Sequence, residues 1–255
     1  TPPCARAFTS LRSHGTIWKI WNSKAKRCDV LTRSFCCFQG ISPAAERRLW
    51  SSGCLSWKSL PLAACPFSTT RLHQLKKQIT EAEAAIKGKV ADYFLSRLPP
   101  GFRLRLWPEF AEGIAFLDIE TTGLRQNAQI TIIGILQGDN LKQFVVGKNL
   151  HRFLECWKQI QILVTFNGER FDIPLIKQAF QLQVTPPHID LMSEARWYGY
   201  SGGLKMIEKT IGFRRPAGKV LSGSDAVSFW KRFETEQDEN LLQDLLYTTN
   251  RMFEP

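Results

Sequence analysis

The sequence predicts an α/β fold in which a mixed sheet flanked by helices follows a small, basic, helical module. From residue 113 onwards, short apolar or alternating runs are separated by turn residues, a pattern typical of strands. Before residue 110 the clearest apolar patterns have helical spacing. The charge also changes near residue 110, because the excess of Lys and Arg lies before it.

The composition is that of a soluble globular protein. Apolar residues make up 44% of the 255 residues and charged residues 22%. No stretch approaches the ~18 consecutive apolar residues of a membrane-spanning helix, so we expect no membrane contact. The length suits two units, each with its own core.

The net charge of +11 is unevenly divided along the chain. Residues 1–110 hold 18 Lys and Arg against 6 Asp and Glu, whereas residues 111–255 hold 16 against 17. A basic segment beside a near-neutral one indicates contact with a polyanion, because binding phosphates releases their counterions. A solvated basic surface without a ligand explains the charge equally well.

The seven cysteines do not form a recognisable zinc or disulfide pattern. Their number is odd, no C-x-x-C pair occurs, and Cys36 and Cys37 are adjacent. Nothing resembles a secretory signal, so we expect reduced thiols in a cytoplasmic protein. The Arg-rich, acid-poor start opens on Thr1 rather than Met, which leaves an organellar transit peptide and a fragment of a longer chain as alternatives.

The chain is expected to contain three segments. Residues 1–34 show no clear period and are predicted to be a poorly structured basic arm. Residues 35–110 are predicted to form a helical, helix-hairpin-helix-like module, and residues 111–255 an α/β domain. No internal repeat is visible.

Within the helical module, Ser42 and Pro43 are predicted to start a helix that ends near Ser51. Gly53 then suits a left-handed turn, and a second short helix follows from Ser56. A long helix over 70–97, with Gly88 as its weak point, and an extended piece over 104–107 complete the module. The glycine turn with Arg47, Arg48 and Lys58 suits a phosphate backbone, but simple helix packing is an equal alternative.

The α/β domain is predicted to follow the order βββαβαβα, beginning with a three-stranded meander. The expected strands cover 114–119, 129–136, 143–146, 162–166 and 189–191. The expected helices cover 150–157, 174–180, 203–211, 224–233 and 239–250. This order is that of a mixed sheet covered by helices.

Two acidic residues stand where the first predicted strand ends. Asp118 and Glu120 are separated by one residue, so both carboxylates project from the same face of a strand. Two acids at one place repel each other unless a cation compensates, and oxygen ligands suit Mg²⁺ or Mn²⁺ better than zinc. For this pair alone, a solvent-facing acidic turn is the simpler interpretation.

A third acid, Asp172, follows the buried strand 162–166 and an Asn-Gly turn. Taken alone it is best explained as the N-cap of the helix that begins near Pro174. Together with Asp118 and Glu120, it supplies a third carboxylate from an adjacent strand end. The three acids then predict a site for divalent cations.

These segments carry a family resemblance. I-A-F-L-D-I-E-T-T-G-L at 114–124 and T-F-N-G-E-R-F-D-I-P at 165–174 resemble the first two motifs of the DEDD exonuclease superfamily. The spacing, H-I-D-L at 188–191 and the G-L-K-x-x-E-x-x-I-G helix at 203–212 are similar to the YprB-like ribonuclease H-like family. A weaker similarity reaches upstream to 40–50 and 93–99.

The resemblance implies a ribonuclease H-like fold over residues 111–255 and a two-metal exonuclease. Asp118, Glu120 and Asp172 would be metal ligands for two Mg²⁺ or Mn²⁺ ions, and Tyr247 a catalytic residue that orients water. Hydrolysis of nucleic-acid phosphodiester bonds would run from 3′ to 5′ on single-stranded ends. No protein partner is implied.

One family position differs. The family carries Asp four residues after the Tyr or His of its last helix, whereas Arg251 stands four residues after Tyr247. Asn250 is a poor substitute, and Asp244 shares the helix face of Tyr247 and is an alternative ligand or an exposed acid. The runner-up function is therefore a catalytically impaired nucleic-acid-binding protein that retains the fold.

Other residues have weaker claims to function. Asp190 lies near the predicted site but suits a capping role better, and His188 is expected to be structural. Trp50 and Trp57 are expected in the core rather than as stacking platforms for bases. A loop with Arg214, Arg215 and Lys219 suits either a phosphate backbone or solvent.

Overall fold

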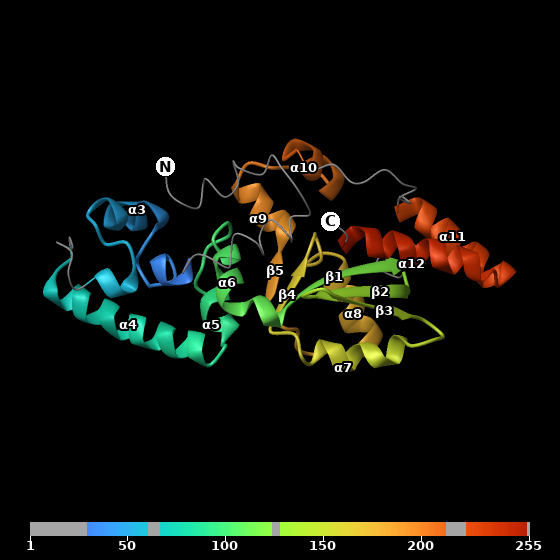
Figure 1. Ribbon diagram of the computed structural model, residues 1–255, viewed down its shortest axis with the longest axis horizontal. Helices are drawn as coiled ribbons and strands as arrows, with labels where there is room; N and C mark the ends of the chain where they lie inside the picture. The colour runs from blue at the N-terminus through green and yellow to red at the C-terminus, as the bar shows by residue number, and fades with distance from the viewer. Residues whose placement is uncertain (1–29, 61–66, 124–127, 213–222, 254–255) are drawn as a thin grey trace.

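The computed structural model confirms the α/β fold with a mixed sheet flanked by helices (Figure 1). It describes residues 30–60, 67–123, 128–212 and 223–253, apart from the side chains of residues 223, 251 and 252. Residues 1–29 of the predicted basic arm lie outside these ranges. No helix in these ranges is long and apolar enough to cross a membrane.

Five strands form one sheet in the order β3-β2-β1-β4-β5. The first three strands are an antiparallel meander, as predicted, while β4 is parallel to β1 and β5 is parallel to β4. Their bounds are β1 Ile114–Thr121, β2 Ile130–Gln137, β3 Asn140–Val145, β4 Ile162–Thr165 and β5 His188–Asp190. The carboxyl ends of β1, β4 and β5 therefore share one edge of the sheet.

The two faces of the sheet are covered by different helices because side chains alternate along each strand. On one face, Ala115, Leu117 and Ile119 of β1 pack against α7 and α8. On this side lie η5 Leu150–Arg152, α7 Phe153–Trp157 and α8 Asp172–Phe180. Figure 1 shows α7 and α8 together on the side of the sheet opposite α12.

The opposite face is divided between the two ends of the chain. Ile132 of β2 and Val145 of β3 pack against α11 Gly223–Glu236 and α12 Glu239–Phe253. Ile162 and Val164 of β4, with Ile189 of β5, pack instead against the N-terminal helical module. Beyond β5 follow α9 Leu191–Trp197 and α10 Leu204–Thr210.

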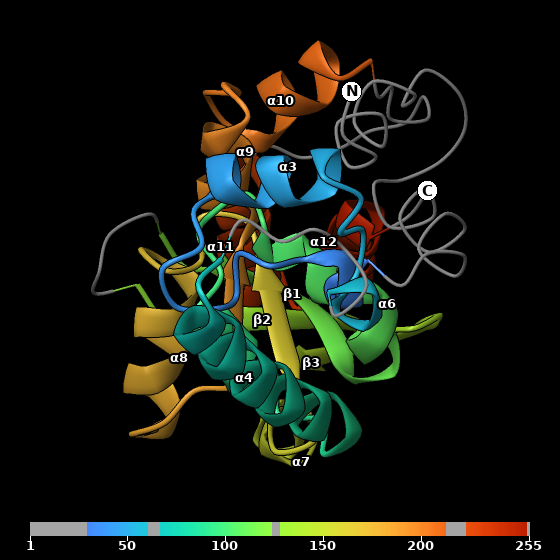
Figure 2. The same ribbon diagram turned by 90° about the vertical axis from the view of Figure 1, so that its left-hand side faces the viewer.

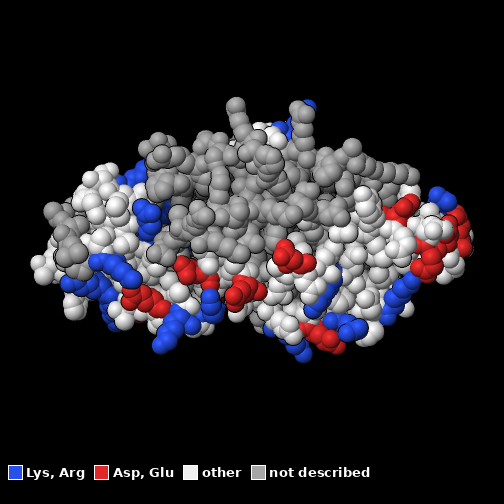
Figure 3. All heavy atoms as spheres, in the orientation of Figure 1, with Lys and Arg blue, Asp and Glu red and all other residues white. Residues whose placement is uncertain are grey.

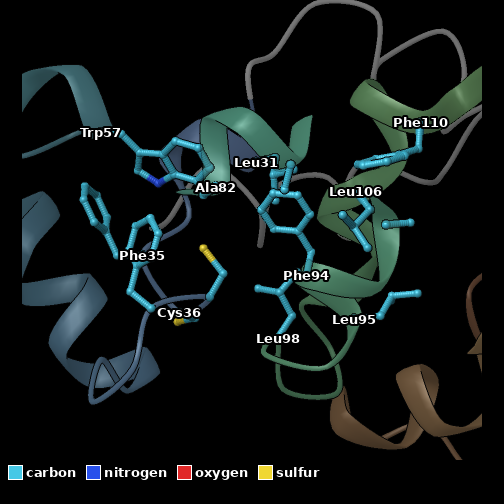
Figure 4. Packing of buried hydrophobic residues seen from close by; sticks show 14 of the residues in the cluster. Leu31, Phe35, Cys36, Trp57, Ala82, Phe94, Leu95, Leu98, Leu106 and Phe110 are labelled. Carbon is cyan, nitrogen blue, oxygen red and sulfur yellow. The ribbon is translucent and has the colours of Figure 1, made fainter. Parts of the chain in front are cut away.

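The N-terminal module consists of short helices around one long one. Figure 2 shows α4 nearest the viewer with α3 above it. The buried residues of this module, from Leu31 to Phe110, pack into one core. Figure 4 shows part of this core. Its elements are η1 Leu31–Arg33, α3 Pro43–Ser51, η2 Trp57–Ser59, α4 Thr69–Lys87, α5 Ala91–Leu95, η3 Arg103–Leu106, α6 Trp107–Phe110 and η4 Ala111–Gly113.

The first helix of this module begins as its sequence predicts. Pro43 is its first residue, and the Ser42 side chain accepts a hydrogen bond from the Ala45 N–H. Gly53 has a φ of 87°, the left-handed conformation expected after the helix. Trp57 is buried in the core as predicted, whereas Trp50 is partly buried against it. Their indole N–H groups donate to the carbonyls of Ser34 and Arg33, respectively.

A buried ion pair ties this module together. The Arg105 Nη1 lies 2.7 Å from Glu46 Oε1, and both side chains are almost fully buried. The other Glu46 oxygen accepts hydrogen bonds from the backbone N–H groups of Phe35 and Cys36 at 2.6 and 3.0 Å. Because these partners satisfy both oxygens, the carboxylate is compensated despite its burial.

Three local predictions were wrong. The helix expected over 70–97 is broken between α4 and α5, where Lys89 adopts a φ of 55°. The piece expected to be extended over 104–107 is helical, since Leu104, Leu106 and Trp107 all turn into the module core. Helix α9 was not predicted, because its apolar residues lack a clear helical period.

Candidate functional site

Asp118 and Glu120 lie on the face of β1 that carries Ile114 and Phe116. In the register with β2, Asp118 pairs with Gly134 and Glu120 with Ile132. Both acids are partly buried, and the register shifts directly after Glu120. The pair therefore sits near the carboxyl end of β1, on the face divided between the N-terminal module and the last helices.

Asp172 reaches the same place from the neighbouring strand. It is the first residue of α8, which follows β4 after a turn, and only 6% of it is exposed. β4 lies parallel beside β1, so the start of α8 and the Asp118–Glu120 segment lie at the same edge of the sheet. The interpretation of Asp172 as an N-cap is wrong, because α8 has no side-chain capping bond at its start.

The three carboxylates repel one another. Burial, followed by the charges of Asp118 and Asp172, raises the pKa of Glu120 to about 8. Burial and the Asp118 charge raise the pKa of Asp172 to about 8 in turn, although hydrogen bonds from the backbone oppose this rise. Like charges gathered in a partly dry site behave in this way when nothing positive compensates them.

This donor set fits hard divalent cations. Three carboxylates supply only oxygen ligands, which Mg²⁺ and Mn²⁺ prefer. Across the described ranges, no three His, Cys, Asp or Glu side chains are drawn together tightly enough to count as a metal-binding group. The three acids share one edge of the sheet without forming such a group.

Asp190 holds the turn that leads to Asp172. Its Oδ1 accepts hydrogen bonds from the N–H groups of Asn167 and Met192, and its Oδ2 accepts one from Glu169. The bond to Met192 caps α9, so the predicted capping role is confirmed. Asp190 is nevertheless close enough for its charge to raise the pKa of Asp172.

Thr165, the last residue of β4, also holds this turn in place. Its hydroxyl accepts a hydrogen bond from the Gly168 N–H and lies 2.9 Å from His188 Nε2, so His188 is structural as expected. A Cβ on Gly168 would lie 2.1 Å from the Thr165 hydroxyl oxygen, which excludes a side chain there. Burial lowers the pKa of His188, which favours the neutral ring in this contact.

The last helix crosses the sheet beside Asp118. A Cβ on Gly134, the β2 partner of Asp118, would lie under 3 Å from side-chain atoms of Thr249 and Phe253 on α12. A glycine is therefore required where α12 approaches the strand. This contact places α12 over β2, directly beside the strand β1 that carries two of the three acids.

The RNase_H superfamily pattern matches residues 115–248, more than half of the chain and the whole segment from β1 into α12. The chain belongs to the RNase_H superfamily. Comparison with curated proteins gave no match.

Among solved structures, this RNase_H superfamily chain is similar to the family B DNA polymerase from the hyperthermophilic archaeon Pyrobaculum calidifontis. The identity is 14% and the TM-score is 0.42. The match covers 53% of this chain and 22% of the polymerase. The chain thus spans about a fifth of the length of that polymerase.

The other site residues expected from the sequence lie on the last helix, α12. Tyr247 lies on α12 with 44% of its surface exposed. Asp244, three residues earlier on the same helix, is also exposed.

The remaining predicted contacts lie elsewhere. Arg214, Arg215 and Lys219 fall outside the described residues. Arg47 and Arg48 are exposed on α3, in the N-terminal module. The bonds that Asp190 accepts from Asn167 and Glu169 have no signal in the sequence, because these residues lie 23 and 21 positions away along the chain.

Proposed function

We propose that this protein is a metal-dependent 3′-to-5′ exonuclease that hydrolyses phosphodiester bonds at single-stranded nucleic-acid ends. The observation that carries the proposal is the placement of three acids at one edge of the sheet: Asp118 and Glu120 near the end of β1, and Asp172 at the start of α8, after the parallel neighbour β4. The charge of Asp118 also contributes to the raised pKa values of Glu120 and Asp172. Membership of the RNase_H superfamily supports a nuclease. The resemblance to the YprB-like DEDD family supports the 3′-to-5′ polarity.

In this proposal the acids Asp118, Glu120 and Asp172 hold two Mg²⁺ or Mn²⁺ ions. Bound divalent ions supply Lewis acidity, which activates water and stabilises charge on the leaving oxygen. The chain supplies the carboxylates, keeps them partly shielded from water, and fixes Asp172 through the turn that Asp190 holds. Tyr247 is proposed to orient the attacking water.

The second candidate is a protein that binds nucleic acid without cutting it. The specific observation in its favour is the last helix, where Arg251 replaces the expected acid and Asp244 is exposed. A cation four residues after Tyr247 would oppose metal binding rather than assist it. Both candidates place the protein in the cytoplasm, which stays a prediction.

A nuclease assay separates the two candidates. The protein is incubated with Mn²⁺ and with single-stranded DNA or RNA labelled at the 5′ end, and products are resolved by length. We expect a ladder of shortened products, since removal from the 3′ end leaves the 5′ label in place. Label at the 3′ end should appear at once as mononucleotide, and the opposite behaviour of the two labels would contradict the polarity.

Matched variants tie the cleavage to the site. Asp118→Asn should lower the rate at least a hundredfold, because it removes a ligand charge without changing size. Asp139→Asn is the control, since Asp139 is exposed in the β2–β3 turn at the other end of the sheet. Equal rates for Asp118→Asn and the parent protein would show that any nuclease activity comes from elsewhere.

Metal binding has a readout that does not need activity. Mn²⁺ at about 100 times its dissociation constant should stabilise the fold by roughly 3 kcal/mol, because it binds only the folded site. The shift in Tm should disappear in Asp118→Asn and in Asp172→Asn but remain in Asp139→Asn. An equal shift in all four proteins would place the bound ion outside the three acids.

A further inference from the structure

Several large apolar side chains are exposed along one short segment that the proposed chemistry does not use. Trp197 is 50% exposed, Tyr198 38% and Met206 57%. They lie at the end of α9 and on α10, within ten residues of one another in sequence. Exposed aromatic residues close together mark a surface that binds something, because solvent alone does not favour them.

The exposed charged side chains within this segment all have the same sign. Between residues 196 and 212, the exposed charged side chains are Arg196, Lys205 and Lys209. The one acid in that stretch, Glu208, is buried. Glu194, two residues before the stretch, is also buried. An exposed surface with cations and no exposed acid is complementary to a polyanion.

The segment begins at the edge of the sheet that carries the proposed site. Helix α9 starts directly after Asp190, whose charge acts on Asp172. Helix α9 has seven residues and a length of about 10 Å, and Trp197 is its last residue. Figure 1 shows α9 continuing from β5 and α10 following it on the same side of the molecule.

The aromatic residues are held in place by the turn before η3. The Trp197 ring covers Gly101 so closely that a Cβ on Gly101 would lie 2.0 Å from the ring atom Cδ1. The centroids of the Trp197 and Phe102 rings are 5.9 Å apart. The Tyr198 hydroxyl donates to the Gly101 carbonyl, and Glu194 Oε2 accepts from the Gly101 N–H at 2.7 Å. The exposed side of Trp197 is thus presented in a fixed orientation, which lowers the entropy lost on binding.

We propose that Arg196, Trp197, Tyr198, Lys205, Met206 and Lys209, named here the α9–α10 surface, bind single-stranded nucleic acid on its way to the acids. Bases would stack on Trp197 and Tyr198, while the three cations contact phosphates. A duplex is a poor fit, because its bases are already stacked on one another. A protein partner is disfavoured by a surface whose exposed charges are all basic. The inference rests on nucleic acid being the ligand, as both candidate functions require.

Binding is measured in EDTA, so that no hydrolysis takes place, by the anisotropy of fluorescein-labelled oligo(dT) and oligo(rU). Trp197→Ala should weaken binding roughly tenfold, the usual effect of losing one stacked base. Lys205→Glu and Lys209→Glu should each weaken binding and lower the slope of log K against log salt by about 0.7 or more. Lys231→Glu on α11 makes the same charge change away from the surface and should bind like the parent protein.

A second readout covers the case in which Trp197→Ala fails to fold. Trp197→Phe keeps an aromatic ring against Gly101 and Phe102, so its stability and affinity should stay within about threefold of the parent protein. Oligonucleotide should quench tryptophan fluorescence in the parent protein, and most of that quenching should be lost in Trp197→Phe. Equal quenching in the two proteins would show that no base stacks on Trp197.

The outcomes separate this inference from the proposed function. If the parent protein binds single strands but Trp197→Ala, Lys205→Glu and Lys209→Glu bind equally well, the α9–α10 surface is overturned while the nuclease proposal stands. If these variants lose affinity and the parent protein still cuts nothing in Mn²⁺, the surface is supported and the nuclease proposal fails. If the parent protein binds neither oligonucleotide, both are overturned.

Discussion

Asp190 is a buried carboxylate that serves the backbone rather than a ligand. Its two oxygens accept three backbone N–H groups, from Asn167, Glu169 and Met192. Asn167 has a φ of 63°, a conformation that costs free energy and needs such support. At the scale of the residue, the position of Asp172 therefore depends on a neighbour that is not proposed to bind metal.

Asp190→Ala is expected to lower the free energy of unfolding by about 3 kcal/mol, because three N–H groups lose their acceptor. Asp190→Asn retains one carbonyl oxygen and should cost about 1 kcal/mol. Denaturant titration measures both values. If the proposed nuclease activity is found, its rate in Asp190→Asn should fall at saturating substrate with the Km for the oligonucleotide unchanged; a change in Km alone would contradict a positioning role.

Glu194 gives a prediction of pH dependence. Burial, only partly offset by the hydrogen bond from Gly101, raises the pKa of this carboxyl from 4.5 to about 7. Its Oε1 is buried without a hydrogen-bond partner among the described residues. Because the folded protein holds this proton more tightly than the unfolded chain, the stabilisation is complete below pH 4.5 and is lost as pH rises through about 7.

Glu194→Gln should therefore gain stability relative to the parent protein as pH rises from 5 to 8. Since one pKa unit corresponds to ~1.4 kcal/mol, the relative gain should reach roughly 3 kcal/mol. Urea titrations of both proteins at several pH values in EDTA measure it, and the difference between the two cancels other titrating groups. A difference that stays constant with pH would show that Glu194 titrates normally.

At the scale of the element, residue patterns within a short stretch of sequence predicted the helix starts and strands that depend on neighbouring residues. Ser42 with Pro43 fixed a helix start, and the alternating runs of the meander gave three strands within a few residues of their bounds. The same is true of the Asp118–Glu120 pair, whose shared face follows from the strand alone. Whether Asp172 joined them depended on β4 lying parallel beside β1, a long-range pairing that the order of strands and helices suggested and the family resemblance reinforced.

The elements that were predicted wrongly depend on distant contacts. The break after α4 forms where Lys89 takes a left-handed conformation and its ammonium group bonds to the Glu109 carbonyl, 20 residues away. The stretch 104–107 alternates like a strand but is helical, since it packs in the N-terminal core. Helix α9 gains its contacts from Gly101, 93 residues before Glu194. No window of neighbouring residues contains such information.

Helix α8 offers a stability prediction at this scale. It ends at Gln181, an exposed residue with a φ of 53°, which favours glycine. Gln181→Gly should raise the free energy of unfolding by about 1 kcal/mol, because glycine adopts this conformation without a steric penalty. Gln181→Ala keeps the penalty and serves as the control in thermal unfolding. Equal stability of both variants would contradict the argument.

At the scale of the whole molecule, charge and core divide the chain differently. Residues 30–60 and 67–110 hold 12 Lys and Arg against 5 Asp and Glu, so the basic character of the first part persists in the described residues. Figure 3 shows basic side chains along the α3–α4 end of one face and acidic ones gathered at the α11 end. The hydrophobic core, in contrast, runs across the boundary near residue 110.

This shared core predicts how the protein unfolds. Ile114, Ile162, Val164 and Ile189 of the sheet are at most 2% exposed and belong to the same cluster as Phe94 and Phe110 of the module. Deleting residues 1–110 would expose these four side chains. At about 1.5–3 kcal/mol for each buried aliphatic side chain, the loss is comparable with the 5–15 kcal/mol that stabilises a typical protein.

We therefore expect a fragment of residues 111–255 to aggregate or to bind a hydrophobic dye, with little near-ultraviolet circular dichroism. A chain of residues 30–255 should instead unfold in one transition, with coincident midpoints by far-ultraviolet circular dichroism and by tryptophan fluorescence. The boundary near residue 110 would then separate two regions of charge and sequence pattern but not two folding units. A fragment that melts cooperatively on its own, or two separate transitions in the longer chain, would show instead that the module and the sheet domain are stable apart, despite their common core.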